Sequence, residues 1–248
     1  MPRKLRDLEG NAIIELDVET WDAAFDVGRI FSNVAELRLG VLRGGGRVDV
    51  RVGPPGVFRD SFELSGVTAA LLYDTLDDTY FPRHGTSAGI EVFRSRPWLG
   101  ADTDANLTTL AATHSWSAGP DTMTVSGEWG MASGESASSL FELGGFLRLS
   151  GYQPGDLAGQ HLRFGRALYF RQLAGGTVPN PLDVALYAGG SVELGNVWVD
   201  RDDVSLDNAL LAGSLFLGAE TFLGPVYLAT GYGEGAGWSA YLFIGSIF

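Results

Sequence analysis

The chain has 248 residues, of which 45% are hydrophobic and 19% charged, and its formal net charge is -13. One domain is the default for this length, and so acidic a chain offers no basic surface for neutralising nucleic-acid phosphates. It contains no cysteine, which excludes disulfides, thiol chemistry and cysteine-ligated metals. Its 35 glycines disfavour helices and suit crowded sheets and turns.

The hydrophobic residues never gather into a run long enough for a transmembrane helix, which needs about 18 or more apolar residues. The N-terminus carries Arg3, Lys4 and Arg6, but acidic residues follow and no apolar core comes after them. We therefore identify no signal peptide. We expect a mature or truncated chain, with residues 1–10 as an N-terminal extension.

Apolar and polar residues alternate along much of the chain. Between Ala35 and Val41 every second residue is apolar, and the residues between them include Glu36 and Arg38. Segments of about ten alternating residues are what a transmembrane β-strand requires. A soluble sandwich has the same period, but charged residues set between apolar neighbours favour a membrane barrel. We predict strands at 11–19, 22–31, 34–52, 63–76, 86–97, 104–116, 121–132, 161–171, 183–196, 208–220, 225–232 and 238–248.

These twelve strands are an even number, as bacterial barrels have. One point stays open in the third strand, because the apolar parity changes between Val41 and Val48 across three glycines, 44–46. Either a glycine bulge bends one long strand there, or a hairpin separates two strands. The segment 132–160 is too long for a turn, and we interpret it as a functional loop.

The last eleven residues alternate down to the final aromatic residue. Ala240, Leu242, Ile244 and Phe248 share one parity. A terminal strand that ends in Phe resembles the C-terminal signal of bacterial outer-membrane barrel proteins. The resemblance implies that Leu242, Ile244 and Phe248 form an assembly signal.

Three further motifs follow one another in a fixed order. Residues 74–85 resemble the D-x-x-D…F-P-x-x-G turn of BamA-type barrels. Residues 141–152 resemble their inward-folded loop, which has a G-G…V-R-G-[F/Y] pattern, and residues 193–198 resemble their D-x-G-N-V-W strand end. The loop tip L-S-G-Y, the G-N-V-W and residues 223–228 are most similar to the barrel of patatin-like phospholipases, the type Vd autotransporters.

The resemblance implies an all-β fold: a transmembrane antiparallel up-and-down β-barrel of about 12 strands, with 14–16 as the alternative because the family's barrel usually has sixteen. Residues 11–248 would form the outer-membrane barrel, and residues 132–160 would fold into its lumen. The implied docking wall for the loop includes Glu193 and Gly195. The implied lumen-loop motif consists of Gly144, Gly145, Leu149, Ser150, Gly151 and Tyr152.

The chain departs from the superfamily's pattern at the loop tip. Ser150 stands where the superfamily has an arginine, and Glu193 corresponds to the acid that pairs with that arginine. A buried carboxylate without a cationic partner is costly. We therefore expect Arg148, Arg163 or Arg171 to supply the cation, because each falls on the parity that we assign to the lumen.

Residues 85–89, GTSAG, match the G-x-S-x-G pattern of serine hydrolases. A nucleophile elbow needs a strand, a sharp turn and a helix, whereas Ile90 and Val92 continue the alternation of a strand, and the chain contains no Asp-Gly dipeptide. We interpret the motif as a chance match and predict no catalytic residue. The three histidines lack metal-ligand spacing, and the acids in 200–207 indicate a solvated patch, so we predict no metal site and no cofactor.

The resemblance implies a bacterial outer-membrane barrel that serves as translocator or anchor for a patatin-like lipase passenger absent from this chain. The alternatives are an insertase-type assembly barrel and a plugged pore. The implied partners are outer-membrane lipid and lipopolysaccharide, the outer-membrane assembly machinery and the passenger domain. The family class also allows a homodimer, and we predict no nucleic-acid partner.

Overall fold

The computed structural model describes residues 2–6, 12–52, 60–134, 141–175, 184–222 and 224–245. Twelve strands form one antiparallel sheet in this part of the chain. They are β1 (Pro2–Arg6), β2 (Ala12–Phe31), β3 (Ala35–Val52), β4 (Asp60–Asp74), β5 (Gly85–Ser95), β6 (Ala105–Ala118), β7 (Asp121–Gly134), β10 (His161–Ala174), β11 (Leu186–Trp198), β12 (Leu210–Thr221), β13 (Gly224–Gly233) and β14 (Gly237–Ile244). Among the described residues, no helix is long and apolar enough to cross a membrane.

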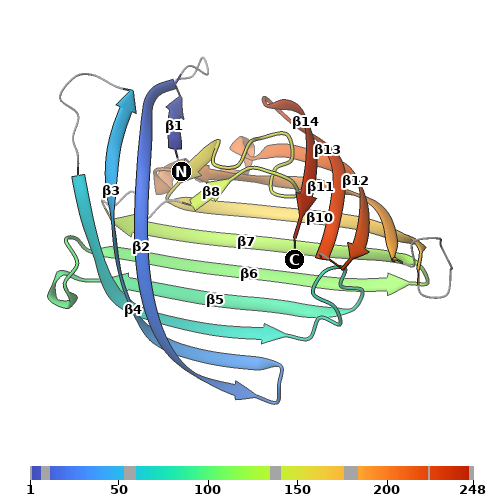
Figure 1. Cartoon of the computed structure of the whole chain (residues 1–248), viewed down its shortest axis with the longest axis horizontal. Coiled ribbons are helices and arrows are strands. Elements are labelled where there is room, and N and C mark those ends of the chain that lie inside the picture. The colour runs from blue at the N-terminus through green and yellow to red at the C-terminus, as the bar shows by residue number, and fades with distance from the viewer. Residues whose placement is uncertain are drawn as a thin grey trace.

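Each strand pairs with its neighbour in the sequence, apart from the insertion between β7 and β10. That insertion carries β8 (Phe141–Leu143) and β9 (Leu157–Gly159), which pair with each other. We call residues 141–160 the infolded loop. The twelve-stranded sheet curls strongly, and the infolded loop lies on its concave side (Figure 1). Within the described residues, no pairing joins β1 to β14.

The fold is the predicted all-β, up-and-down antiparallel sheet, but the first strands divide differently. The separate strands predicted at 11–19 and 22–31 are wrong, because β2 continues through Thr20 and pairs with β3 without a break there. Residues 2–6, inside the predicted N-terminal extension, form β1 and pair with β2. The count of twelve therefore holds while its membership changes.

The three glycines of β3 make neither a bulge nor a hairpin. The register of β3 with β2 and with β4 runs on through residues 44–46. A Cβ at Gly45 would lie 2.7 Å from the carbonyl oxygen of Phe62, and a Cβ at Gly46 would lie 2.6 Å from that of Glu19. Glycine at these positions lets β2 and β4 pack closely on either side of β3, which remains one uninterrupted strand.

The two faces of the sheet differ in polarity as a membrane barrel requires. On β11, Val192 is 61% exposed on the outer face, while Glu193 and Ser191 are buried on the inner face. The same outer face carries many large exposed apolar side chains. Among them are Phe25, Leu39, Leu71, Leu110, Val125, Leu215, Leu228, Leu242 and Ile244.

The inner face is filled unevenly. Over β7 and β10–β14, the infolded loop and the β4–β5 connection pack two buried clusters, one around Leu147, Phe170 and Tyr227 and the other around Leu149 and Phe164. Over β2–β6, a cavity of about 470 Å³ lies open on the inner face. Packing in the lumen is therefore concentrated in the C-terminal half of the sheet.

Candidate functional site: the docked tip of the infolded loop

The tip of the infolded loop has an unusual backbone. Gly144 and Gly145 adopt φ values of 133° and 104°, and Leu147 and Leu149 also have positive φ, at 61° and 66°. Such angles are uncommon for a non-glycine residue and persist only where surrounding contacts impose them. Both leucines are fully buried, so the packing of the tip holds this backbone in place.

Glu193 receives the tip. Its carboxylate accepts a hydrogen bond from the backbone N–H of Ser150 at 2.7 Å and another from the Ser150 hydroxyl at 2.8 Å. The hydroxyl of Ser191, next but one on β11, donates a third. Ser150 and Glu193 are both fully buried. The three hydrogen bonds to this buried carboxylate are charge-assisted and therefore strong. Two of them place Ser150, from the predicted lumen-loop motif, directly against Glu193, from the predicted docking wall.

The next two residues of the tip reach the last hairpin of the sheet. The Gly151 N–H donates to the Tyr241 hydroxyl at 2.7 Å, and the Ser239 hydroxyl donates to the Gly151 carbonyl at 2.9 Å. The Tyr152 hydroxyl donates to the carbonyl of Glu234. Burial, together with the carboxylates of Glu234 and Asp156, raises the pKa of the Tyr152 hydroxyl, so this group keeps the proton that it donates.

Gly195, the second predicted wall residue, serves strand packing. A Cβ there would lie 2.6 Å from the Arg163 carbonyl oxygen and 3.0 Å from the Cα of Phe164. The phenyl ring of Phe164 in turn packs in the cluster that contains Leu149. Gly195 therefore lets β10 and β11 pack closely, two residues along the strand from Glu193.

The prediction that Arg148, Arg163 or Arg171 supplies the cation for Glu193 is wrong. Arg148 forms an ion pair with Glu128 on β7, at 2.9 Å. Arg171 pairs with Asp121 at 3.0 Å. Arg163 donates to the carbonyls of Gly130 and Leu162 and lies 4.8 Å from the ring of Trp129. None of these three arginines is paired with Glu193 in the described part of the chain.

The parity assignment on β10 explains this error. The apolar, even-numbered residues of β10 face the filled lumen, so Leu162, Phe164 and Leu168 are buried. Arg163 and Arg171 therefore lie on the outer face. Arg166 lies on the inner face, where its Cα is paired in register with that of Glu193.

Arg166 is the functional residue that the sequence reasoning missed. It is 8% exposed, and its guanidinium donates to the carbonyl of Leu147 at 3.2 Å and to the Ser126 hydroxyl at 3.4 Å. It also interacts electrostatically with Glu193. Its even parity, shared with the apolar core residues of β10, was the signal that could have identified it. The arginine that supports the loop, Arg166, therefore lies on β10 and not at the loop tip.

The predicted F-P-x-x-G turn also folds inward. Phe81 is buried and stacks on Tyr187, with ring centroids 3.9 Å apart and an angle of 15° between the rings. Asp78 holds this turn by accepting from the N–H groups of Tyr80 and Phe81. The turn therefore closes the same half of the lumen as the infolded loop, from the end of the sheet where β4 meets β5.

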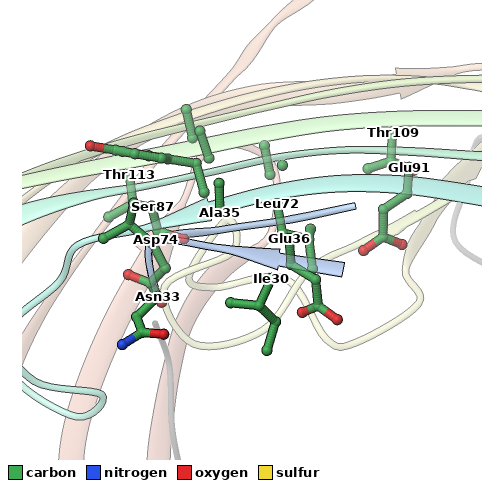
Figure 2. A pocket seen from close by; sticks show the side chains of 16 residues that line it. Ile30, Asn33, Ala35, Glu36, Leu72, Asp74, Ser87, Glu91, Thr109 and Thr113 are labelled. Atoms are coloured by element: carbon green, nitrogen blue, oxygen red, sulfur yellow. The ribbon is translucent and has the colours of Figure 1, made fainter. Parts of the chain in front are cut away.

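The GTSAG segment forms the start of β5, a strand without the turn that a nucleophile elbow needs. Ser87 lines the open cavity over β2–β6, where Figure 2 shows it beside Asp74 and Thr113. No histidine lines this cavity among the described residues. His114 lies on the adjacent strand and bonds the hydroxyl of Thr86 at 2.8 Å.

The acids of residues 200–207 lie in or next to two short 3-10 helices, η3 (Arg201–Asp203) and η4 (Leu206–Asn208). Asp200, Asp202, Asp203 and Asp207 are all exposed. In the described part of the chain, no group of three or more His, Asp or Glu side chains is placed to hold a metal ion. Of the predicted assembly signal, Leu242 and Ile244 point outward from β14, and Phe248 lies outside the described residues.

Neither a protein-family model nor a curated protein sequence matches the chain. Among solved structures, the chain is similar to BamA from Haemophilus ducreyi lacking POTRA domains 1-3, with a TM-score of 0.74 and 13% identity over 92% of this chain and 54% of that one. It is also similar to CdiB from Escherichia coli, with a TM-score of 0.65 and 14% identity over 94% of this chain and 44% of that one. A third similar structure is CdiB from Acinetobacter baumannii, with a TM-score of 0.59 and 14% identity over 94% and 42%. The chain spans about half the length of these structures, and it has the fold of BamA-type outer-membrane barrels.

Proposed function

We propose that this chain is a barrel of the bacterial outer membrane that acts as a translocator or anchor for a passenger. The observation that carries the proposal is the infolded loop, docked through Ser150 and Glu193 inside a sheet whose outer face is apolar. An apolar outer face would meet lipid and lipopolysaccharide. A loop that is held inside by hydrogen bonds can close a lumen and can also leave it.

The mechanism uses the uneven filling of the lumen. The infolded loop and Phe81 close the side formed by β7 and β10–β14. The cavity over β2–β6 stays open, and acidic and hydroxyl side chains line it together with Ile30 and Leu72. A passenger segment would pass along that open side, and withdrawal of the loop tip from Glu193 would widen the path. Strand pairing satisfies the backbone groups that face lipid.

The finer proposal is that the passenger is a patatin-like lipase. It is supported only by the sequence resemblance of the L-S-G-Y tip, the G-N-V-W strand end and residues 223–228. We propose that the chain itself carries out no catalysis, because Ser87 lies within a strand and the cavity that it lines contains no histidine among the described residues.

Surface display tests the translocator. The chain would be sent to the outer membrane of a bacterial host with a folded reporter domain fused before Met1, and externally added protease would probe the reporter. Translocation predicts that the reporter is cleaved from outside the cell and that Glu193→Ala changes the fraction exposed. A reporter that stays protected while the barrel is inserted would refute translocation and leave an anchor without transport.

A second candidate, an insertase-type assembly barrel, is favoured by one observation. In the described residues, the outer edge of β14 has no partner strand, and β1 covers β2 only up to Asp17. Exposed edges are templates for pairing with another chain. Faster folding of a second outer-membrane protein into vesicles that contain this chain would support the insertase, and a large single-channel conductance would instead support a pore.

A further inference from the structure

The tip of the infolded loop touches two strands that lie far apart in the sheet. On β11 it binds Glu193 through Ser150. On the last hairpin it binds Ser239 and Tyr241 through Gly151 and the backbone of Glu234 through Tyr152. β12 and β13 lie between these anchors. A four-residue tip therefore bridges three strand interfaces from inside the lumen.

The last hairpin is shaped to receive the tip. A Cβ at Gly231 would lie 2.5 Å from the Cβ of Ser150, and a Cβ at Gly233 would lie 2.9 Å from the ring of Tyr152. Gly151 has φ of 109°, and a Cβ there would lie 2.2 Å from the backbone nitrogen of Gly233. Side chains at these glycines of β13 and of the tip would exclude the contact. The fit therefore requires glycine on both partners.

β14 needs such a support. It has eight residues and, within the described part of the chain, pairs only with β13. An edge strand lacks half of the ladder hydrogen bonds of a central strand. Phe146, from the same infolded loop, adds packing against Tyr241 and Phe243, with ring centroids 5.5 and 6.4 Å apart. The inner face of the edge strand is therefore held mainly by the loop.

We propose that the loop tip is a latch that fastens the β13–β14 hairpin to β11, so that release of the loop and loosening of the last strand are one event. When the tip leaves, β14 loses its contacts through Ser239, Tyr241 and the Phe146 ring together. The latch is a property of the fold, and its use during transport rests on the proposed translocator function. In that setting, opening the lumen would also loosen β14 against the rest of the sheet.

Hydrogen–deuterium exchange on the full chain in lipid vesicles tests the latch. Tyr241→Phe removes the acceptor for the Gly151 N–H and keeps the ring. We expect exchange to rise by about 2- to 12-fold in both 149–152 and 238–244, the effect of losing one hydrogen bond. The matched control is Tyr232→Phe, because the Tyr232 hydroxyl makes no hydrogen bond within the described residues and its ring lies outside, against Trp238. This control should leave both segments unchanged.

The decisive variant is Glu193→Gln, on the far anchor. Among the described residues, the hydrogen bonds of Glu193 go to Ser150 and Ser191 and not to β14, so a purely local role predicts no change in residues 238–244. The latch predicts faster exchange there, and it predicts that the double variant with Tyr241→Phe is less than additive. Unchanged exchange in β14 for Glu193→Gln would overturn the proposal. A gel shift on boiling for each variant separates this result from a failure to fold, and no cargo is needed, so failure of transport would leave the result standing.

Discussion

Replacing Glu193 by alanine would remove the acceptor at the centre of the docked loop. Three donors would lose their partner: the Ser150 N–H, the Ser150 hydroxyl and the Ser191 hydroxyl. A hydrogen bond to a charged group contributes about 1.5–3 kcal/mol, but bonds to one carboxylate do not add. The variant would also remove a carboxylate whose charge acts on the buried Arg166 guanidinium, and each buried donor left without an acceptor costs about 1–3 kcal/mol. We expect a loss of about 3–5 kcal/mol in the free energy of unfolding.

Urea unfolding of the chain in lipid vesicles, followed by tryptophan fluorescence, measures this loss. Glu91→Ala is the matched control, because Glu91 lies on the same inner face but lines the open cavity over β2–β6. The control should stay within about 0.5 kcal/mol of the unmodified chain. A Glu193→Ala barrel that unfolds at the same urea concentration as the Glu91→Ala barrel would refute the docking argument.

Three further substitutions test separate parts of the structure, each by the same urea unfolding in vesicles. Gly151→Ala should cost about 1–3 kcal/mol for backbone strain, and more because the new Cβ would lie 2.2 Å from the backbone nitrogen of Gly233. Gly119→Ala, with open space around the new Cβ, should cost about 1 kcal/mol. Leu217→Arg should destabilise the barrel by about 2–4 kcal/mol if its outer-face side chain meets lipid. Ile30→Arg should be nearly neutral, because Ile30 is at least as exposed but lies on the inner face; equal losses would contradict the assigned faces. Phe81→Ala should cost about 3–5 kcal/mol because the ring is buried in the lumen, and a loss below about 1 kcal/mol would show that the turn does not plug it.

The alternating period predicted most of the sheet, because a strand with one polar and one apolar face records its orientation in every second residue. β11 is the clearest case, with Val192 and Leu194 outside and Tyr187 and Glu193 inside. The resemblance of residues 141–152 to the superfamily's loop implied a loop that docks near Glu193, and the structure places Ser150 against that carboxylate.

The period failed where the lumen is filled. On β10 both faces are partly apolar, since one meets lipid and the other packs against Leu147 and Leu149, so parity alone assigned Arg163 to the wrong side. The identity of Arg166 as the wall cation depends on its register with Glu193, which is a pairing between strands that a single sequence does not record. The contact of Gly151 with Tyr241 joins residues 90 positions apart and was equally out of reach.

The division of the first strands failed for a different reason. Residues Glu19 to Trp21 contain no glycine or proline, and β2 passes through them without a turn. The predicted number of twelve strands is right only because two errors cancel: the false break in β2 adds one strand, and the missed β1 removes one. Strand counts taken from periodicity therefore need the observed pairing to support them.

We expect these strands to form a barrel embedded in lipid, with the infolded loop inside. Electrophoretic heat modifiability of the chain refolded into lipid vesicles tests it most directly. A lipid-embedded barrel with a docked loop should give a compact band before boiling, a slower band after boiling, and a lower transition temperature for Glu193→Ala than for Glu91→Ala. A chain that remains a water-soluble monomer and shows no shift on boiling would contradict it.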